Sequence, residues 1–143
     1  MVQIRKISAD KTYQIRLEIL RNGMDLPVQF SGDFDKETFH LGVFEDGNLK
    51  GIASFMKTTN DLFELPQYQL RGMATLEEVR GKGLGKQLLI EGINILRDRN
   101  VRVLWCNARE VALNFYEKLE FSVEGNSFEI PEIGKHYIMY KKI

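Results

Sequence analysis

Seven consecutive residues in the middle of the chain have the composition of an anion-binding turn. The segment combines three glycines with three basic residues: Arg80, Gly81, Lys82, Gly83, Leu84, Gly85 and Lys86. A helix N-terminus presents unpaired backbone N–H groups and partial positive charge, so sequences normally place Asp or Glu in its first turn. Basic residues and glycines at a helix start instead predict a site where an external anion, such as a phosphate, approaches the backbone. A solvated turn, whose glycines satisfy only backbone geometry, is the alternative that these residues leave open.

Two well-known phosphate-binding loops do not fit this segment. A P-loop would need Gly at the position of Arg80 and Ser or Thr at that of Gln87. The dinucleotide fingerprint, started at Gly81, would need Gly at the position of Lys86. Residue identity therefore excludes both motifs, and with them the hypothesis of a nucleotide-dependent oxidoreductase that rests on the glycines alone.

The elements on either side of the turn must position it. Apolar residues predict a strand over 68–75 before the turn, and their helical spacing predicts a helix from Leu84 to about Arg99 after it. The other expected elements are strands over 2–7, 39–43, 50–56, 101–105, 121–130 and 135–142, and helices over about 8–22 and 109–119. This order predicts antiparallel strands first, and then one strand–helix–strand crossover that makes two neighbouring strands parallel.

Two local patterns sharpen this prediction near the N-terminus. In the first helix, Tyr13, Leu17 and Leu20 are expected to share one apolar face. Asp46-Gly47 lies between two strand candidates, and this dipeptide predicts a tight hairpin.

The pattern R-x-x-G-x-G, present as Arg80, Gly83 and Gly85, carries a resemblance to a known family. It is similar to the signature Q/R-x-x-G-x-G/A of the GNAT superfamily of acyl-CoA-dependent N-acetyltransferases, which lies between the fourth strand and the third helix. Segment 68–75 resembles the strand that ends in that loop.

A second stretch extends the resemblance downstream. Asn107 and segment 114–121 resemble the second GNAT motif, N…(A/N)-x-x-(F/Y)-Y-x-K-x-G-F, except that Glu120 replaces the usual glycine in a helix-to-strand turn. The resemblance is strong over 68–121, and the element order extends it over the rest of the chain. It implies a mixed α/β fold, with a mostly antiparallel sheet, one parallel crossover and helices on both faces.

The resemblance implies acetyl-CoA as co-substrate, and no metal. The residues implied to contact it are Met73, Ala74, Thr75, Arg80, Gly81, Lys82, Gly83, Leu84, Gly85, Lys86, Asn107 and Asn114. Loop amides would wrap the CoA pyrophosphate, the backbone of 73–75 would pair with the pantetheine arm as an added strand, and one of those amides would be the oxyanion donor. Phe115 is a further packing candidate, for which a core role is favoured.

Tyr116 is the general acid that the resemblance implies. Acetyl transfer from a thioester to an amine expels a thiolate, which a tyrosine hydroxyl with an ordinary pKa of about 10 can protonate. Tyr116 also falls on the helical pattern that Ala112 and Leu119 continue, so a core role is the alternative.

His136 is the first choice for the general base, because it lies at the beginning of the last strand, which in this fold runs near the acceptor channel. Other side chains with suitable chemistry are His40, Glu110 and Glu77. Cys106 lies in an apolar strand and is expected to be a buried structural thiol. Family members mostly transfer the acyl group directly in a ternary complex, which also argues against an acyl-cysteine.

The acceptor is predicted to be a small primary amine. In GNAT proteins it is selected by segments that correspond here to 24–38 and 126–137. The first of these carries four acids, Asp25, Asp33, Asp35 and Glu37, against one lysine. Their charge favours a cationic amine, such as a polyamine, amino sugar or lysine-like amine. A solvated acidic loop is the alternative, and a peptide N-terminus or a protein lysine as acceptor stays open.

A second function class competes with the enzyme. A non-catalytic module could hold CoA as a sensor or interaction protein, and only Tyr116 together with a usable base separates the two hypotheses.

Composition sets the outer limits of these hypotheses. The 143 residues are 28% charged and 43% hydrophobic with formal net charge +0, which argues against a disordered regulator and against a nucleic-acid-coating protein. We expect one N-acetyltransferase domain over 1–143; since many GNAT proteins dimerise, a homodimer stays open. One cysteine allows no intrachain disulfide, and the N-terminus lacks the apolar core of a signal peptide. No apolar stretch could span a bilayer, so we expect a soluble, cytoplasmic protein without a membrane partner.

Overall fold

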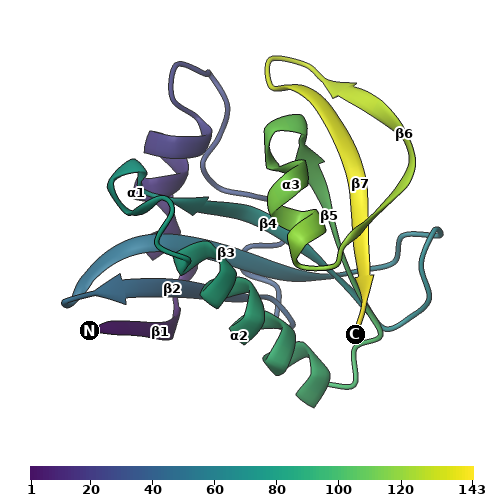
Figure 1. The fold of residues 1–143 in the computed structure, drawn as a ribbon, viewed down its shortest axis with the longest axis horizontal. Helices are drawn as coiled ribbons and strands as arrows, with labels where there is room; N and C mark the ends of the chain where they lie inside the picture. The colour runs from purple at the N-terminus through teal and green to yellow at the C-terminus, as the bar shows by residue number, and fades with distance from the viewer.

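A seven-stranded sheet forms the centre of the computed structural model, which describes residues 1–143 (Figure 1). In chain order the strands are β1 (Val2–Ile7), β2 (Phe39–Glu45), β3 (Asn48–Thr58), β4 (Gln67–Thr75), β5 (Val103–Arg109), β6 (Ser122–Ile130) and β7 (Gly134–Lys142). Their spatial order is β1-β2-β3-β4-β5-β7-β6, and only the β4–β5 pair is parallel. The predicted mixed sheet with one parallel crossover is therefore confirmed.

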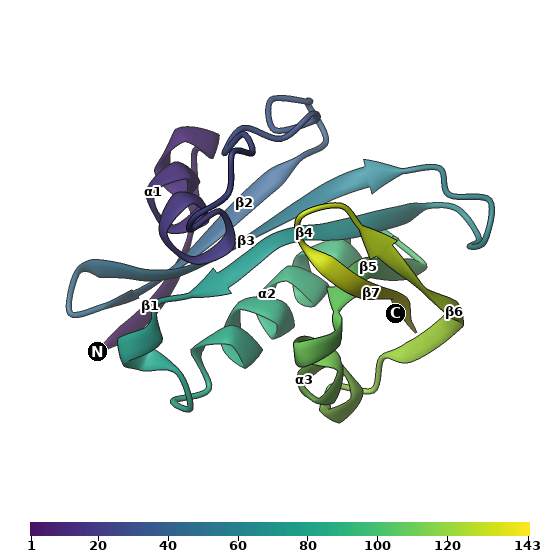
Figure 2. The ribbon, with the colours of Figure 1, turned by 90° about the horizontal axis from the view of Figure 1, so that it is seen from above.

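Helices cover both faces of this sheet (Figure 2). Helices α2 (Leu84–Asp98) and α3 (Leu113–Lys118) lie on one face, and the short helix α1 (Tyr13–Ile15) lies on the other. A 3-10 turn, Ala9–Thr12, precedes α1, and a π-helical turn, Arg16–Leu20, follows it. No helix of the chain is both long and apolar enough to cross a membrane.

The packing of α2 against the sheet is the one that its sequence pattern predicts. Leu88, Leu89 and Leu96 are fully buried in the main core with the ring of Phe55 from β3. Gly92 lets the helix approach this ring, because a Cβ atom there would lie 2.1 Å from the ring atom Cζ of Phe55. This close approach fixes the height of α2, and so of its N-terminal loop, above the sheet.

The expected face of the first helix is wrong. Leu17 is 54% exposed, whereas Ile15 and Arg16 are buried. The Arg16 guanidinium is fully buried against the carboxylate of Asp33, at 2.7 Å and 3.0 Å. The apolar periodicity of a helix predicts that a charged side chain such as Arg16 faces solvent. It cannot predict that an ion pair buries this side chain and so rotates the helix to place Arg16 inside.

The predicted hairpin between β2 and β3 is confirmed. Glu45 pairs with Asn48, and the two residues between them, Asp46 and Gly47, have φ values of 51° and 84°. Positive φ at both central residues is the geometry of the tight turn that Asp-Gly favours.

The two parallel strands separate halfway along their length. They pair from Gln67 with Val103 to Leu70 with Cys106, and no pairing continues beyond that point. In β4 the next residues include Gly72, with φ of 59°, at an irregularity in the pairing with β3. The end of β4 therefore keeps one backbone edge without a neighbouring strand, next to an opening in the sheet.

Candidate active site

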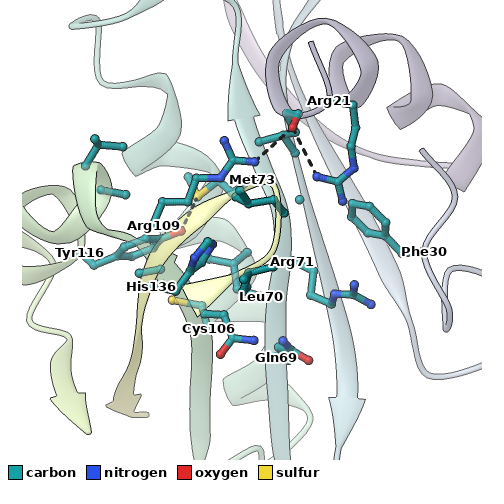
Figure 3. Close-up of a pocket in the computed structure, with 18 residues that line it drawn as sticks. Arg21, Phe30, Gln69, Leu70, Arg71, Met73, Cys106, Arg109, Tyr116 and His136 are labelled. Carbon is teal, nitrogen blue, oxygen red and sulfur yellow. Dashed lines mark hydrogen bonds between the residues drawn. The ribbon is translucent and has the colours of Figure 1, made fainter. Parts of the chain in front are cut away.

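A cavity of about 240 Å³ opens where β4 and β5 separate (Figure 3). Its wall combines the middle of β4, the end of β5 and the start of β7 with the segment after α1, the 3-10 turn before α3 and Tyr116 of α3. Tyr116, Cys106 and His136 all line it, although they come from three different elements. The separation of the parallel strands is what gives these buried side chains a common space.

Tyr116 reaches the cavity from α3. The residue is 8% exposed, and its hydroxyl donates to the sulfur of Met73 at 3.9 Å. Burial, followed by the neighbouring Cys106, raises the pKa of the Tyr116 hydroxyl well above its usual value of 10.0. The hydroxyl therefore keeps its proton at neutral pH, as a donor must.

His136 enters the same cavity from β7, where it pairs with Arg109 of β5. It is 3% exposed, and its Nδ1 lies 2.7 Å from the carbonyl oxygen of Gly134. Because a carbonyl only accepts, Nδ1 must be the protonated donor of this bond. In the neutral imidazole this bond therefore leaves the lone pair on the other ring nitrogen, Nε2.

The other candidate bases lie elsewhere. His40 is buried between the Ser54 hydroxyl and the backbone carbonyl of Asp33, and Glu110 pairs with Lys135 at 3.4 Å on the surface. Glu77 is exposed in a short 3-10 turn that precedes the glycine-rich loop. Among the four candidate bases, only His136 lines the cavity that holds Tyr116.

Cys106 is a buried thiol, as the sequence predicts. It is 2% exposed, and burial raises its pKa to about 12, an effect that the nearby Tyr116 hydroxyl reduces. A thiol with this pKa holds almost no thiolate at neutral pH and is a poor nucleophile.

The glycine-rich loop borders a second cavity, of about 420 Å³, on the α2 side of the sheet. Gly83, with φ of 79°, is the N-cap residue of α2 and offers no side-chain cap, so the first amides of the helix have no partner in a preceding turn. Arg80, Lys82 and Lys86 are all exposed here, and Cβ atoms added at Gly81 or Gly83 would meet open space. The loop thus fits the phosphate groups of a CoA molecule in charge, donors and room.

Most residues expected to contact acetyl-CoA line one of the two cavities. Met73 and Asn107 line the first cavity, and Thr75 and Phe115 line the second. Asn114 is exposed on α3 and lines neither of them. No cluster of three or more metal-ligating side chains occurs in the chain.

The first cavity is not the acidic acceptor site that the sequence predicts. None of the acids of segment 24–38 lines this cavity, and the carboxylate of Asp33 is paired with Arg16 instead. Sequence reasoning missed three arginines that do line it, namely Arg21, Arg71 and Arg109. These arginines are far apart in the sequence, and only the folding of the chain brings them together, so no local motif predicts them.

Comparisons with known proteins agree with this geometry. Residues 5–121 match the acetyltransferase (GNAT) family. The chain is 40% identical over 145 residues to the "uncharacterized N-acetyltransferase YitI" of Bacillus subtilis (strain 168), and the match covers 100% of this chain and 97% of YitI.

Solved structures share the fold at lower identity. Escherichia coli ElaA has a TM-score of 0.81 at 15% identity and is covered, like this chain, to 99%. The ribosomal-protein-S18-alanine N-acetyltransferase of Escherichia coli has a TM-score of 0.77 at 21% identity, over 100% of this chain and 94% of that one. Together with the family match and the 40% identical relative, this means that the chain belongs to the GNAT family of acetyltransferases and is an acyl-CoA-dependent N-acyltransferase.

Proposed function

We propose that the protein transfers the acetyl group of acetyl-CoA to the primary amine of a small molecule, by direct attack in a ternary complex. The observation that carries the proposal is the meeting of two side chains in one cavity: Tyr116, whose hydroxyl is protonated, and His136, whose Nδ1 is held by a backbone carbonyl. That cavity opens at the unpaired end of β4, next to the glycine-rich loop.

The loop and the strand edge supply the binding surface for acetyl-CoA. Amides at the start of α2, with Arg80, Lys82 and Lys86 around them, receive the phosphates. The unpaired backbone of β4 from Met73 to Thr75 receives the pantetheine arm as an added strand, and one of its N–H groups binds the thioester oxygen. These assignments follow the family resemblance and the open backbone edge, and they leave the first cavity for the acetyl group and the amine.

The chemistry then needs one base and one acid. The Nε2 atom of His136 takes a proton from the acceptor ammonium or amine, and the amine nitrogen forms a bond to the thioester carbonyl carbon. The carbon–sulfur bond breaks as the carbonyl re-forms, and the departing sulfur receives the hydroxyl proton of Tyr116. The Tyr116 phenolate then regains a proton, from the attacking nitrogen when the acceptor entered as ammonium, or from His136 through solvent when it entered as amine. The products are an N-acetyl amide and free CoA thiol. Cys106 stays protonated and forms no bond in this sequence.

A thiol-release assay with acetyl-CoA and a panel of amines tests the proposal. Tyr116→Phe is expected to lower kcat about 10²- to 10⁴-fold, the range of general acid–base catalysis. Tyr13→Phe is the matched control, because the Tyr13 hydroxyl bonds only the Gln29 side chain and lies outside the cavity. His136→Gln should reduce kcat similarly, and most strongly at low pH, where less of the amine is unprotonated.

Two results would contradict the proposal. A Tyr116→Phe variant as active as Tyr13→Phe would remove the tyrosine from the chemistry. A protein that binds acetyl-CoA tightly and releases no thiol with any amine would instead be a CoA-binding module.

A further inference from the structure

Three arginines of the first cavity have no acidic partner. Arg21 follows the π-helical turn, Arg71 lies on β4, and Arg109 ends β5; we call them the arginine cluster. None of them forms an ion pair, and no Asp or Glu is among the 18 residues that line the cavity. The cavity wall therefore carries three positive charges and no carboxylate.

Neutral backbone oxygens hold the cluster in place. Arg21 donates to the carbonyl of Pro27 at 3.1 Å, and Arg71 donates to that of Ser31 at 3.2 Å. Arg109 donates to the carbonyl of Leu20 at 3.2 Å, toward which Arg21 also points (Figure 3). A guanidinium has five N–H donors, so these bonds orient each group and leave donors for a ligand.

The carboxylate of Asp33, which lies near the cluster, already has a partner. Both oxygens of Asp33 accept from Arg16, one of them also accepts the Phe30 amide at 2.9 Å, and the side chain is fully buried. Asp33 thus neutralises Arg16 and cannot serve the cluster.

The ring of Phe30 keeps the cations close together. The guanidinium carbons of Arg71 and Arg21 lie 4.7 Å and 5.3 Å from its centroid, and that of Arg16 lies at 3.8 Å. Gly72 makes room for the ring, because a Cβ there would lie 2.7 Å from a Phe30 ring carbon. Burial and then mutual repulsion lower the pKa of Arg21, as expected for cations confined without a counter-ion.

We propose that the acceptor is a small anionic amine whose carboxylate or phosphate group is bound by the arginine cluster, while its amine faces His136 and the thioester. This inference rests on the proposed acetyl transfer and names its substrate class. Arginines favour carboxylate and phosphate because their planar N–H groups match two oxygens at once. A polyamine would meet only positive charge in this cavity. The anionic amine therefore replaces the cationic acceptor that we expected from segment 24–38.

Matched pairs of amines test the preference. In the thiol-release assay, β-alanine is compared with β-alaninamide, and O-phosphoethanolamine with ethanolamine; spermidine serves as the polycation. The anionic member is expected to have a kcat/KM at least about tenfold higher, since a charge-assisted hydrogen bond is worth about 1.5–3 kcal/mol. The two pairs distinguish a carboxylate from a phosphate substrate. Equal rates within both pairs, a preference for spermidine, or activity only on peptides would overturn the inference.

Variants of the cluster separate binding from chemistry. Arg71→Gln and Arg109→Gln should each raise the KM for the anionic amine about 10- to 100-fold and change its kcat little. The KM for acetyl-CoA should stay the same, and the activity on the neutral partner amine should fall much less than that on the anionic amine. Arg97→Gln is the control, because Arg97 is exposed on α2 far from the cavity lining. An unchanged KM in both cluster variants would refute the role of the cluster.

A binding measurement distinguishes failure of this inference from failure of the proposed function. With CoA saturating the other anion site, inorganic phosphate should raise the Tm of the wild type and of Arg97→Gln, and should raise it less in either cluster variant. Phosphate stabilisation without acetylation of any amine would reject the proposed transfer and keep the anion site. Acetylation without a preference for anions, and without cluster-dependent stabilisation, would reject the inference alone.

Discussion

The buried ion pair of Arg16 and Asp33 predicts a large loss of stability for Asp33→Asn. The two side chains are fully buried, with two hydrogen bonds of 2.7 Å and 3.0 Å between them. Arg16 further donates to the Val28 carbonyl and the Ser54 hydroxyl, both at 2.9 Å. Asparagine keeps the shape of Asp33 and removes its charge, so the variant leaves a buried guanidinium without its counter-ion.

Removing one partner of such a pair destabilises a protein by about 3–5 kcal/mol. For a chain of 143 residues the entropy of unfolding makes this a decrease in Tm of about 10–17 °C. Calorimetry or thermal circular dichroism measures the change directly. Glu78→Gln is the control, because the Lys50–Glu78 pair is 3.1 Å long but the glutamate is 64% exposed, and little change is expected there.

A double-mutant cycle and a pH series make this prediction refutable. Arg16→Met combined with Asp33→Asn should destabilise by less than the sum of the single variants, because no unpaired charge remains. Burial raises the pKa of Asp33, but the Arg16 hydrogen bond, the Phe30 amide and nearby charges outweigh it, so the net pKa is below 3.8. The wild type should therefore lose this stabilisation only as the pH falls below about 4, and Asp33→Asn should lack that dependence. A Tm decrease of less than about 3 °C, or additive single variants, would refute the reasoning.

Three further predictions concern other parts of the molecule. Gly92→Ala should destabilise by about 1–3 kcal/mol, although alanine is the better helix former, because its Cβ would overlap the Phe55 ring; chemical denaturation measures this, and Asn94→Ala in the same helix should not destabilise. The single thiol, Cys106, should react with DTNB at pH 8 only after unfolding, since its pKa is about 12; rapid reaction of the native protein would contradict its burial. Lys86→Gln should weaken CoA binding about 10-fold, as measured by calorimetry. It should weaken the binding of phosphate-free pantetheine derivatives less, because Lys86 lines the cavity that we expect to hold the phosphates.

Local patterns were enough to predict most of the fold. The apolar spacing from Leu84 to Leu96 predicts α2, and the Asp46-Gly47 dipeptide predicts its hairpin, because each feature depends on residues close in sequence. The crossover predicts the parallel β4–β5 pair, because the connection between parallel strands must pass over the sheet. The buried face of the first helix could not be predicted, because it depends on the ion pair of Arg16 with Asp33, 17 residues further along the chain.

The candidate site also contains residues that can be predicted from the sequence and residues that cannot. The glycine-rich loop and Tyr116 lie within motifs that can be seen in the sequence. His136 could be suggested only from the family's topology, since its place beside Tyr116 depends on β7 pairing with β5. The arginine cluster could not be predicted, because strand pairing and the bulge at Gly72 bring its members together and no spacing records that convergence.

The separation of β4 from β5 gives the sheet a third edge, inside the molecule. Outer edges of sheets attract other chains, and β1 limits this with charged residues such as Arg5 and Lys6. The inner edge is protected differently, because residues of α3 and of the segment after α1 line the passage at this edge, a cavity of about 240 Å³. A folded strand cannot enter such a passage, whereas a thin extended ligand can. An unfinished sheet is thus kept from self-assembly by enclosure, and the backbone amides of β4 that face the inner edge remain available for exchange with solvent until a ligand covers them.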